Sequence, residues 1–164
     1  MACMIGKEGR DIPIDEAPDY IAGYCILNDW SARDIQRREM RVGLGPAKGK
    51  DFATSLGPYL VTANELEGLR KNKGFDLAMT AKRNGELLSK GNFSDIYYSF
   101  AEMIFWASQR ATLYPGDVFG SGTVGKGCIL ELRPENSGRW PKSGDITELE
   151  IDNLGTLRTE IIDS

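Results

Sequence analysis

The distribution of apolar residues along the chain predicts many short β-strands. Two continuous apolar runs of strand length cover residues 1–5 and 21–27. Residues 76–83 alternate polar and apolar positions, which is the pattern of a strand with one buried face. Asn84-Gly85 then predicts a type I′ turn and a hairpin. Short runs bounded by turn residues predict further strands over residues 59–62, 87–89, 118–119, 128–132, 146–151 and 156–162.

Helical periodicity is confined to a few segments. Apolar side chains recur at helical spacing between residues 95 and 110, so we expect one longer helix with an aromatic stripe in the core, capped by Ser94. Residues 31–39 predict a short helix or turn, and Asp15 is a candidate N-cap of another, with Pro18 in its first turn. Many short strands and one longer helix indicate an α+β, β-rich fold rather than a doubly wound sheet.

Composition and charge narrow the class of protein. A chain of 164 residues suits one domain, and a net charge of −4 gives no sign of the basic face that nucleic-acid binding needs. No apolar run is long enough to span a bilayer and no secretory signal follows Met1, so we expect a cytoplasmic protein with no membrane partner. Cys3, Cys25 and Cys128 lack C-x-x-C spacing and are predicted to be buried free thiols.

The complete lack of histidine limits the chemistry. It excludes a Ser-His-Asp triad, a Cys-His pair and a histidine-ligated metal. A metal ion would need oxygen ligands, which favours Mg²⁺, Mn²⁺ or Ca²⁺. A general base would have to be a carboxylate, a lysine or a metal-bound water.

Residues 27–36, in the order L-N-D-W-S-A-R-D-I-Q, bring charged and amide side chains directly after a predicted strand. A G-K-D-F run downstream adds Lys50. Polar chemistry at the end of a buried strand often forms a site, because the strand fixes its geometry. At helical spacing Asp29, Arg33 and Gln36 would share one face, which favours a common site. The open alternative is a turn with ordinary surface charges.

These residues resemble the fumarylacetoacetate hydrolase (FAH) family, whose members carry N-D-W-S-A-R-D-I-Q and then a G-K-x-F lysine. The resemblance covers nearly the whole chain in family order, and it implies a single FAH-like catalytic domain over residues 1–164. It also implies a mixed β-sandwich or roll with short helices and one longer helix. The other matching blocks are L-G-P-Y-L-V-T at residues 56–62, N-G-E at 84–86, L-Y-P-G-D at 113–117 and G-S-G-T at 120–123.

The resemblance assigns roles to individual residues. Asp29 matches one of three carboxylates that hold Mg²⁺ or Mn²⁺ in the family, and Lys50 matches a catalytic lysine beside the metal. Arg33, Gln36 and Thr123 match positions that bind the substrate. Together these residues would place positive charge where negative charge develops on a 2-oxo acid.

Other positions depart from the family pattern. Glu131 matches a catalytic glutamate that assists water activation, but its histidine partner is missing, and a salt-bridged core glutamate is the open alternative. No Glu-x-Glu pair precedes Asp29 to supply the other two metal ligands. We therefore expect a chain that lacks the family's N-terminal part. Met40 stands where fumarylacetoacetase has a tyrosine, which argues against that enzyme's own substrate.

The resemblance implies a metal-dependent hydrolase that cleaves C–C bonds of acylpyruvate-like 2-oxo acids. The alternatives are a related isomerase, decarboxylase or hydratase acting on 2-oxo-dienoates, or a non-catalytic scaffold without a complete metal site. A third possibility is that another chain supplies the missing glutamates. The expected partners are a small 2-oxo acid and a second copy of the chain in a homodimer.

Overall fold

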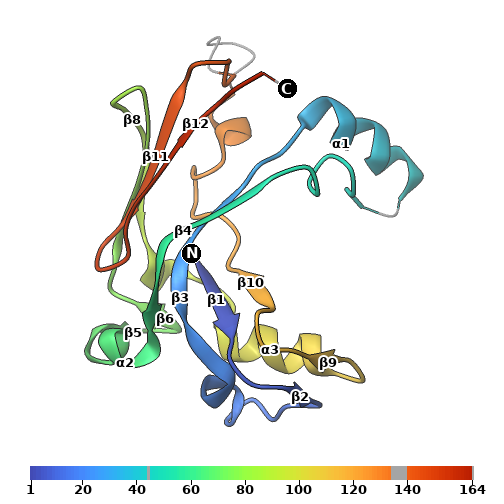
Figure 1. Ribbon diagram of the computed structural model, residues 1–164, viewed down its shortest axis with the longest axis vertical. Coiled ribbons are helices and arrows are strands. Elements are labelled where there is room, and N and C mark those ends of the chain that lie inside the picture. The colour runs from blue at the N-terminus through green and yellow to red at the C-terminus, as the bar shows by residue number, and fades with distance from the viewer. Residues whose placement is uncertain (44, 134–139, 164) are drawn as a thin grey trace.

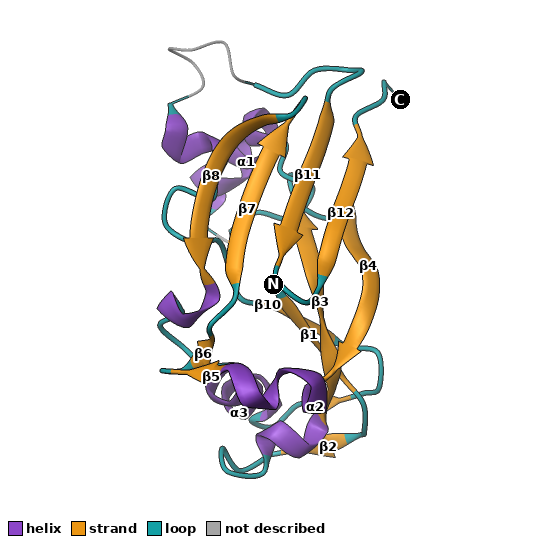
Figure 2. Ribbon diagram, turned by 90° about the vertical axis from the view of Figure 1, so that its left-hand side faces the viewer, coloured by secondary structure: helices purple, strands orange, loops and turns teal. Residues whose placement is uncertain are grey.

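The computed structural model describes residues 1–43, 45–133 and 140–163. Two four-stranded antiparallel sheets form its body (Figures 1 and 2). The first sheet has the order β10 (Val118–Gly120), β1 (Ala2–Ile5), β3 (Ile21–Asp29) and β4 (Thr54–Thr62). The second has the order β12 (Gly155–Glu160), β11 (Ile146–Ile151), β7 (Ala78–Arg83) and β8 (Glu86–Asn92).

Short strand pairs and helices complete the fold, and with them the predicted β-rich α+β class is confirmed. β2 (Gly9–Arg10) pairs with β9 (Thr112–Leu113), and β5 (Arg70–Lys71) pairs with β6 (Gly74–Phe75). The α-helices are α1 (Arg33–Glu39), α2 (Ala63–Leu66) and α3 (Phe100–Ser108). The 3₁₀ helices are η1 (Ala17–Tyr20), η2 (Met40–Val42), η3 (Glu67–Leu69), η4 (Phe93–Asp95) and η5 (Ile129–Leu132). None of the helices in these described ranges is long and apolar enough to cross a membrane.

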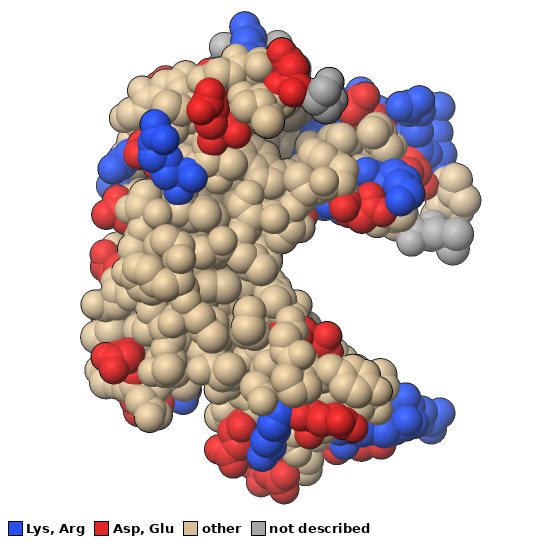
Figure 3. Space-filling view, viewed as in Figure 1, with Lys and Arg blue, Asp and Glu red and all other residues tan. Residues whose placement is uncertain are grey.

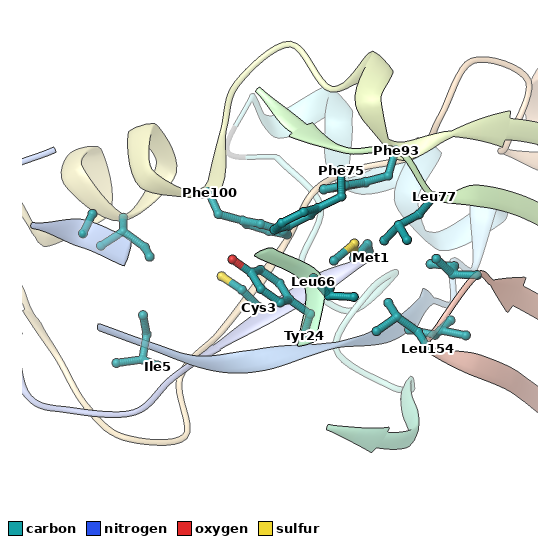
Figure 4. Packing of buried hydrophobic residues seen from close by; sticks show 14 of the residues in the cluster. Met1, Cys3, Ile5, Tyr24, Leu66, Phe75, Leu77, Phe93, Phe100 and Leu154 are labelled. Atoms are coloured by element: carbon teal, nitrogen blue, oxygen red, sulfur yellow. The ribbon is translucent and has the colours of Figure 1, made fainter. Parts of the chain in front are cut away.

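An aromatic cluster lies at the centre of the core (Figure 4). The rings of Tyr24 and Phe75 meet edge to face with centroids 5.1 Å apart, and those of Phe93 and Phe100 stack at 5.7 Å. Strands β3 and β6, the 3₁₀ helix η4 and helix α3 therefore share one buried cluster. Leu154, fully buried beside β11, brings the second sheet into the same core.

Two parts of the molecule project from this body. Figure 1 shows α1 and the segment that returns from it to β4 as an arm at one end, while α3, β2 and β9 lie at the other. Figure 3 shows a hollow between these two ends. No residue of α1 is buried, so the apolar core does not extend into this helix.

Most strand predictions are confirmed. β1, β3, β7 and β11 lie where the apolar patterns predict, and β3 runs two residues further, to Asp29. Asn84 and Gly85 both have positive φ, 51° and 79°, as a type I′ turn requires, and they join β7 to β8. The strand predicted over residues 128–132 is wrong, because residues 129–132 form η5. β10 ends at Gly120, and Glu131 closes a local turn by accepting from the Lys126 amide.

The helix boundaries differ from the predicted ones. The longer helix is α3, which begins after Ser99, so Ser94 is not its cap and is buried in η4. The prediction of Asp15 as an N-cap is also wrong, since η1 starts after Glu16 without a side-chain cap. Pro18 lies in the first turn of η1, as predicted. In these segments, short polar side chains offer several possible caps, and tertiary packing selects among them.

Two predictions about buried side chains need correction. Trp106 of the aromatic stripe is 71% exposed, although Phe100 and Ile104 on the same helix are buried. Cys3 and Cys25 are buried free thiols as expected, but Cys128 is only half-buried.

The cap of α3 predicts a pH-dependent contribution to stability. Glu102 receives hydrogen bonds from Lys73 Nζ at 2.7 Å and from the amide and hydroxyl of Ser99, and these bonds lower its pKa to about 2. An unfolded chain would bind this proton near pH 4.5. The stabilisation is therefore fully present above about pH 4.5 and is lost as the pH falls toward 2. In urea unfolding, Glu102→Gln should be less stable than the parent at pH 7, and this gap should close on acidification. A gap that stays constant with pH would contradict the role of the carboxylate.

Candidate functional site

The last residue of β3 carries the first site carboxylate. Asp29 lies opposite Thr54 of β4, so both strands fix its backbone. Its carboxylate forms an ion pair with Lys50, whose side chain is 28% exposed against 51% for Asp29. The structure thus brings together two residues that are 21 positions apart in the sequence.

Arg33 and Gln36 meet on the first turn of α1. Arg33 Nη1 donates to Gln36 Oε1 at 2.6 Å, and Arg33 Nη2 donates to Cys128 Sγ at 3.0 Å. Their predicted proximity is confirmed, through the i, i+3 spacing of the helix. The prediction that Asp29 shares a helical face with Arg33 and Gln36 is wrong, because α1 begins at Arg33 and Asp29 still belongs to β3. The contact with Cys128 could not be expected from any motif in the sequence.

The turn at residues 47–49 is bonded to a residue that the sequence analysis missed. The Glu39 carboxylate accepts from the backbone N–H groups of Ala47, Lys48 and Gly49 at 3.0, 2.6 and 3.1 Å. Partial desolvation acts to raise the pKa of Glu39, but the three N–H donors together lower it below its usual value. The available sequence signal was a glutamate at the end of a helix followed by a glycine-rich loop.

Thr123 and Glu131 have surroundings different from those of Asp29 and Lys50. Thr123 is exposed and lines a small cavity of about 90 Å³ together with Met1 and Leu27, and neither Asp29 nor Lys50 borders that cavity. Glu131 is exposed too, and it accepts from the Lys126 amide at 2.6 Å. The alternative of a core glutamate is therefore wrong. The substrate-binding role of Thr123 and the catalytic role of Glu131 stay predictions.

A larger cavity of about 700 Å³ lies beside α1. Its apolar walls come from Trp30, Phe52 and Trp140, and Arg33 and Arg37 border it. Trp30 is oriented by a hydrogen bond from its Nε1 to the hydroxyl of Ser55 at 2.9 Å. The remaining lining residues are Ser31, Asp34, Ala53, Ser55, Pro141, Thr159, Glu160 and Ile161. Arg33 therefore connects the polar cluster on α1 to a space large enough for a small organic molecule.

The described residues do not by themselves fit a divalent metal site. Within residues 1–43, 45–133 and 140–163, no group of three or more His, Cys, Asp or Glu side chains could hold a metal ion. Asp29 offers one carboxylate, and Lys50 already occupies it. Hard cations need several oxygen ligands at once. Asp29 as a ligand of Mg²⁺ or Mn²⁺ accordingly stays a prediction.

These features define a β-rich α+β domain with a charged site at the end of a buried strand. The chain belongs to the fumarylacetoacetate hydrolase family, since residues 1–162 match the family model described as fumarylacetoacetate (FAA) hydrolase C-terminal. The family expected from the N-D-W-S-A-R-D-I-Q run is thereby confirmed.

Curated relatives and solved structures agree with this membership. An oxaloacetate tautomerase of Bacillus subtilis is 34% identical over 98% of this chain, which covers 50% of the relative. A maleylpyruvate hydrolase of Aquipseudomonas alcaligenes is 36% identical over 98% of this chain and 48% of its own length. A fumarylpyruvate hydrolase of Pseudomonas aeruginosa, solved with Mn²⁺ and pyruvate, aligns with a TM-score of 0.80 at 26% identity, over 99% of this chain and 64% of its own. The chain thus spans about half the length of the curated relatives it matches.

Proposed function

We propose that this chain carries active-site residues for 2-oxo acids, which stabilise the enolate of the substrate. The observation that carries the proposal is the pairing of Lys50 with Asp29 at the end of β3, with the Arg33–Gln36 pair on the adjoining helix. Lys50 would donate to the enolate oxygen, and Arg33 would bind the carboxylate through its planar guanidinium. The names of the relatives, which include a maleylpyruvate hydrolase and oxaloacetate tautomerases, support this substrate class.

The first candidate reaction is hydrolysis of an acylpyruvate. Water adds to the distal carbonyl, the C–C bond breaks, and its electron pair passes to the methylene carbon of the pyruvate enolate, which then takes up a proton. The products are a carboxylate and pyruvate. This reaction needs a group that activates water, and Glu131 is the residue predicted for that step. A homodimer, a cytoplasmic location and dependence on Mg²⁺ or Mn²⁺ belong to the same proposal, and the relative solved with Mn²⁺ supports the last of these.

The second candidate is keto–enol tautomerisation of a 2-oxo acid. It moves one proton between carbon and oxygen and consumes no water. One observation favours it: Glu131 is exposed and already accepts from the Lys126 amide, and the sequence has no histidine to assist it. Stabilisation of the enolate by Lys50 is common to both reactions, so the site can serve either.

Two assays on the purified chain would test the proposal. Tautomerisation of oxaloacetate is followed by the ultraviolet absorbance of its enol, and hydrolysis is followed by loss of the diketone absorbance of an acylpyruvate such as fumarylpyruvate. Each is run with and without added MnCl₂. We expect acceleration above the buffer rate in at least one assay. A folded chain that accelerates neither reaction under either condition would contradict the proposal and favour the non-catalytic scaffold.

A further inference from the structure

The arm that carries Lys50 lacks a core of its own. α1 has no buried residue, and Figure 1 shows the arm extending beyond the two sheets. The Lys50 ammonium group nevertheless forms an ion pair with the Asp29 carboxylate, at the base of this arm. A flexible lysine side chain can hold a defined position only if its backbone is fixed. The contacts that fix residues 47–50 therefore decide where the ammonium group lies.

One carboxylate supplies three of these contacts. Glu39 accepts from the amides of Ala47, Lys48 and Gly49, which are the three residues immediately before Lys50. Hydrogen bonds from backbone N–H groups to a charged carboxylate are stronger than those between neutral groups. Glu39 is also the last residue of α1, so it connects the helix end directly to this turn.

The same turn is attached to the start of the helix. The Ala32 amide, at the N-cap of α1, donates to the Gly49 carbonyl at 2.9 Å. Gly49 is buried against Gln36, and a Cβ at that position would lie 2.9 Å from the Gln36 amide nitrogen. The turn is thus held at both ends of α1, and the Lys50 amide itself donates to the Ala47 carbonyl at 2.9 Å.

We propose that Glu39 is a positioning residue for Lys50: its carboxylate fixes the 47–49 turn against α1 and thereby directs the Lys50 ammonium onto Asp29. Only the catalytic use of Lys50 rests on the proposed function, because the positioning itself is a property of the free protein. The charged neighbours of Glu39 in the turn are Lys48 and Asp51, which pair with each other at 2.8 Å. Glu39 therefore acts on the backbone rather than through an ion pair.

The test measures the reactivity of Lys50 without any substrate. Acetylation by N-hydroxysuccinimidyl acetate is followed at each lysine by peptide mass spectrometry in the parent, Glu39→Ala, Glu39→Gln and the control Glu65→Ala, which removes an exposed glutamate on α2. We expect Glu39→Ala to speed labelling of Lys50 by about twofold to fivefold, the change in population that an exposed ion pair supports. Glu39→Gln, which keeps one acceptor oxygen, should be intermediate. Lys82 in β7 should not change in any variant.

A second measurement separates positioning from general destabilisation. Hydrogen exchange of peptides covering residues 45–52 should rise in Glu39→Ala, while exchange in β11 stays at the parent rate. A folded Glu39→Ala protein with parent-like labelling of Lys50 and parent-like exchange in this turn would overturn the proposal. If Glu39→Ala does not fold, the same two readouts on Glu39→Gln decide. Altered labelling in a protein inactive in both assays would uphold the positioning role while the proposed function fails.

Where activity is present, a double-mutant cycle adds a further criterion. If Glu39 acts through Lys50, the Glu39→Ala/Lys50→Met protein should be no slower than Lys50→Met alone. Effects that multiply in the double variant would mean that Glu39 affects the activity independently of Lys50, and would contradict the proposal.

Discussion

Replacing Phe75 with alanine is expected to lower the free energy of unfolding by about 3–5 kcal/mol. The Phe75 ring is 3% exposed and lies between two other rings, edge to face with Tyr24 at 5.1 Å and stacked on Phe93 at 6.2 Å. Its loss removes buried apolar area and leaves a cavity where β3, β6 and η4 meet. Those elements are separated widely in the sequence, so the cavity cannot close by a local adjustment.

Equilibrium urea unfolding, followed by far-ultraviolet circular dichroism, measures this loss. Phe52→Ala is the matched control, since it makes the same chemical change at a side chain that is 58% exposed, and we expect it to cost less than about 1 kcal/mol. The m-values of both variants should match the parent, so that the shift in midpoint reports stability. Equal losses in the two variants would mean that the aromatic cluster is not the centre of the core.

The parts of this fold that could be predicted from the sequence are those encoded locally. Asn84-Gly85 specifies its own turn because both residues tolerate positive φ, and the alternation over residues 76–83 shows that a strand enters that turn. Residues 128–132 carry an equally apolar pattern but form η5. A strand also needs a neighbouring strand edge, and that requirement is set by the rest of the fold rather than by local composition.

In the candidate site, too, local sequence patterns predict some contacts and not others. Arg33 and Gln36 could be paired from their spacing, because a helix brings residues i and i+3 together. Lys50 could be associated with Asp29 only through the family resemblance, since no local rule links residues across an intervening helix and loop. Glu39 was missed because its partners are backbone amides, so the sequence signal was limited to a glutamate before a glycine-rich loop. The cavity walls join Trp30 to Trp140 across most of the chain, so no short motif could reveal them.

Within the proposed function, Lys50→Met is expected to reduce kcat by about 10²–10³-fold, the usual cost of removing one donor from a developing oxyanion. Methionine keeps most of the length and apolar stem of lysine but has no ammonium group, so the substitution isolates the charge. The fold should survive, because the ion pair with Asp29 is partly exposed and contributes less than about 1 kcal/mol. The measurement is steady-state kinetics in whichever of the two assays the parent protein supports.

Lys48→Met is the matched control for this prediction. It removes the same charge two residues away, from a side chain that is 79% exposed and pairs with Asp51 rather than with Asp29. A general electrostatic effect of the loop on an anionic substrate would slow both variants to a similar extent, and it would fade as salt is added. A role specific to Lys50 predicts near-parent kinetics for Lys48→Met and a loss in Lys50→Met that persists at high salt, because a donor in direct contact with the enolate is not replaced by dissolved ions. Equal losses in the two variants would mean that Lys50 has no specific role in the reaction. The loop would then act only as a source of diffuse positive charge.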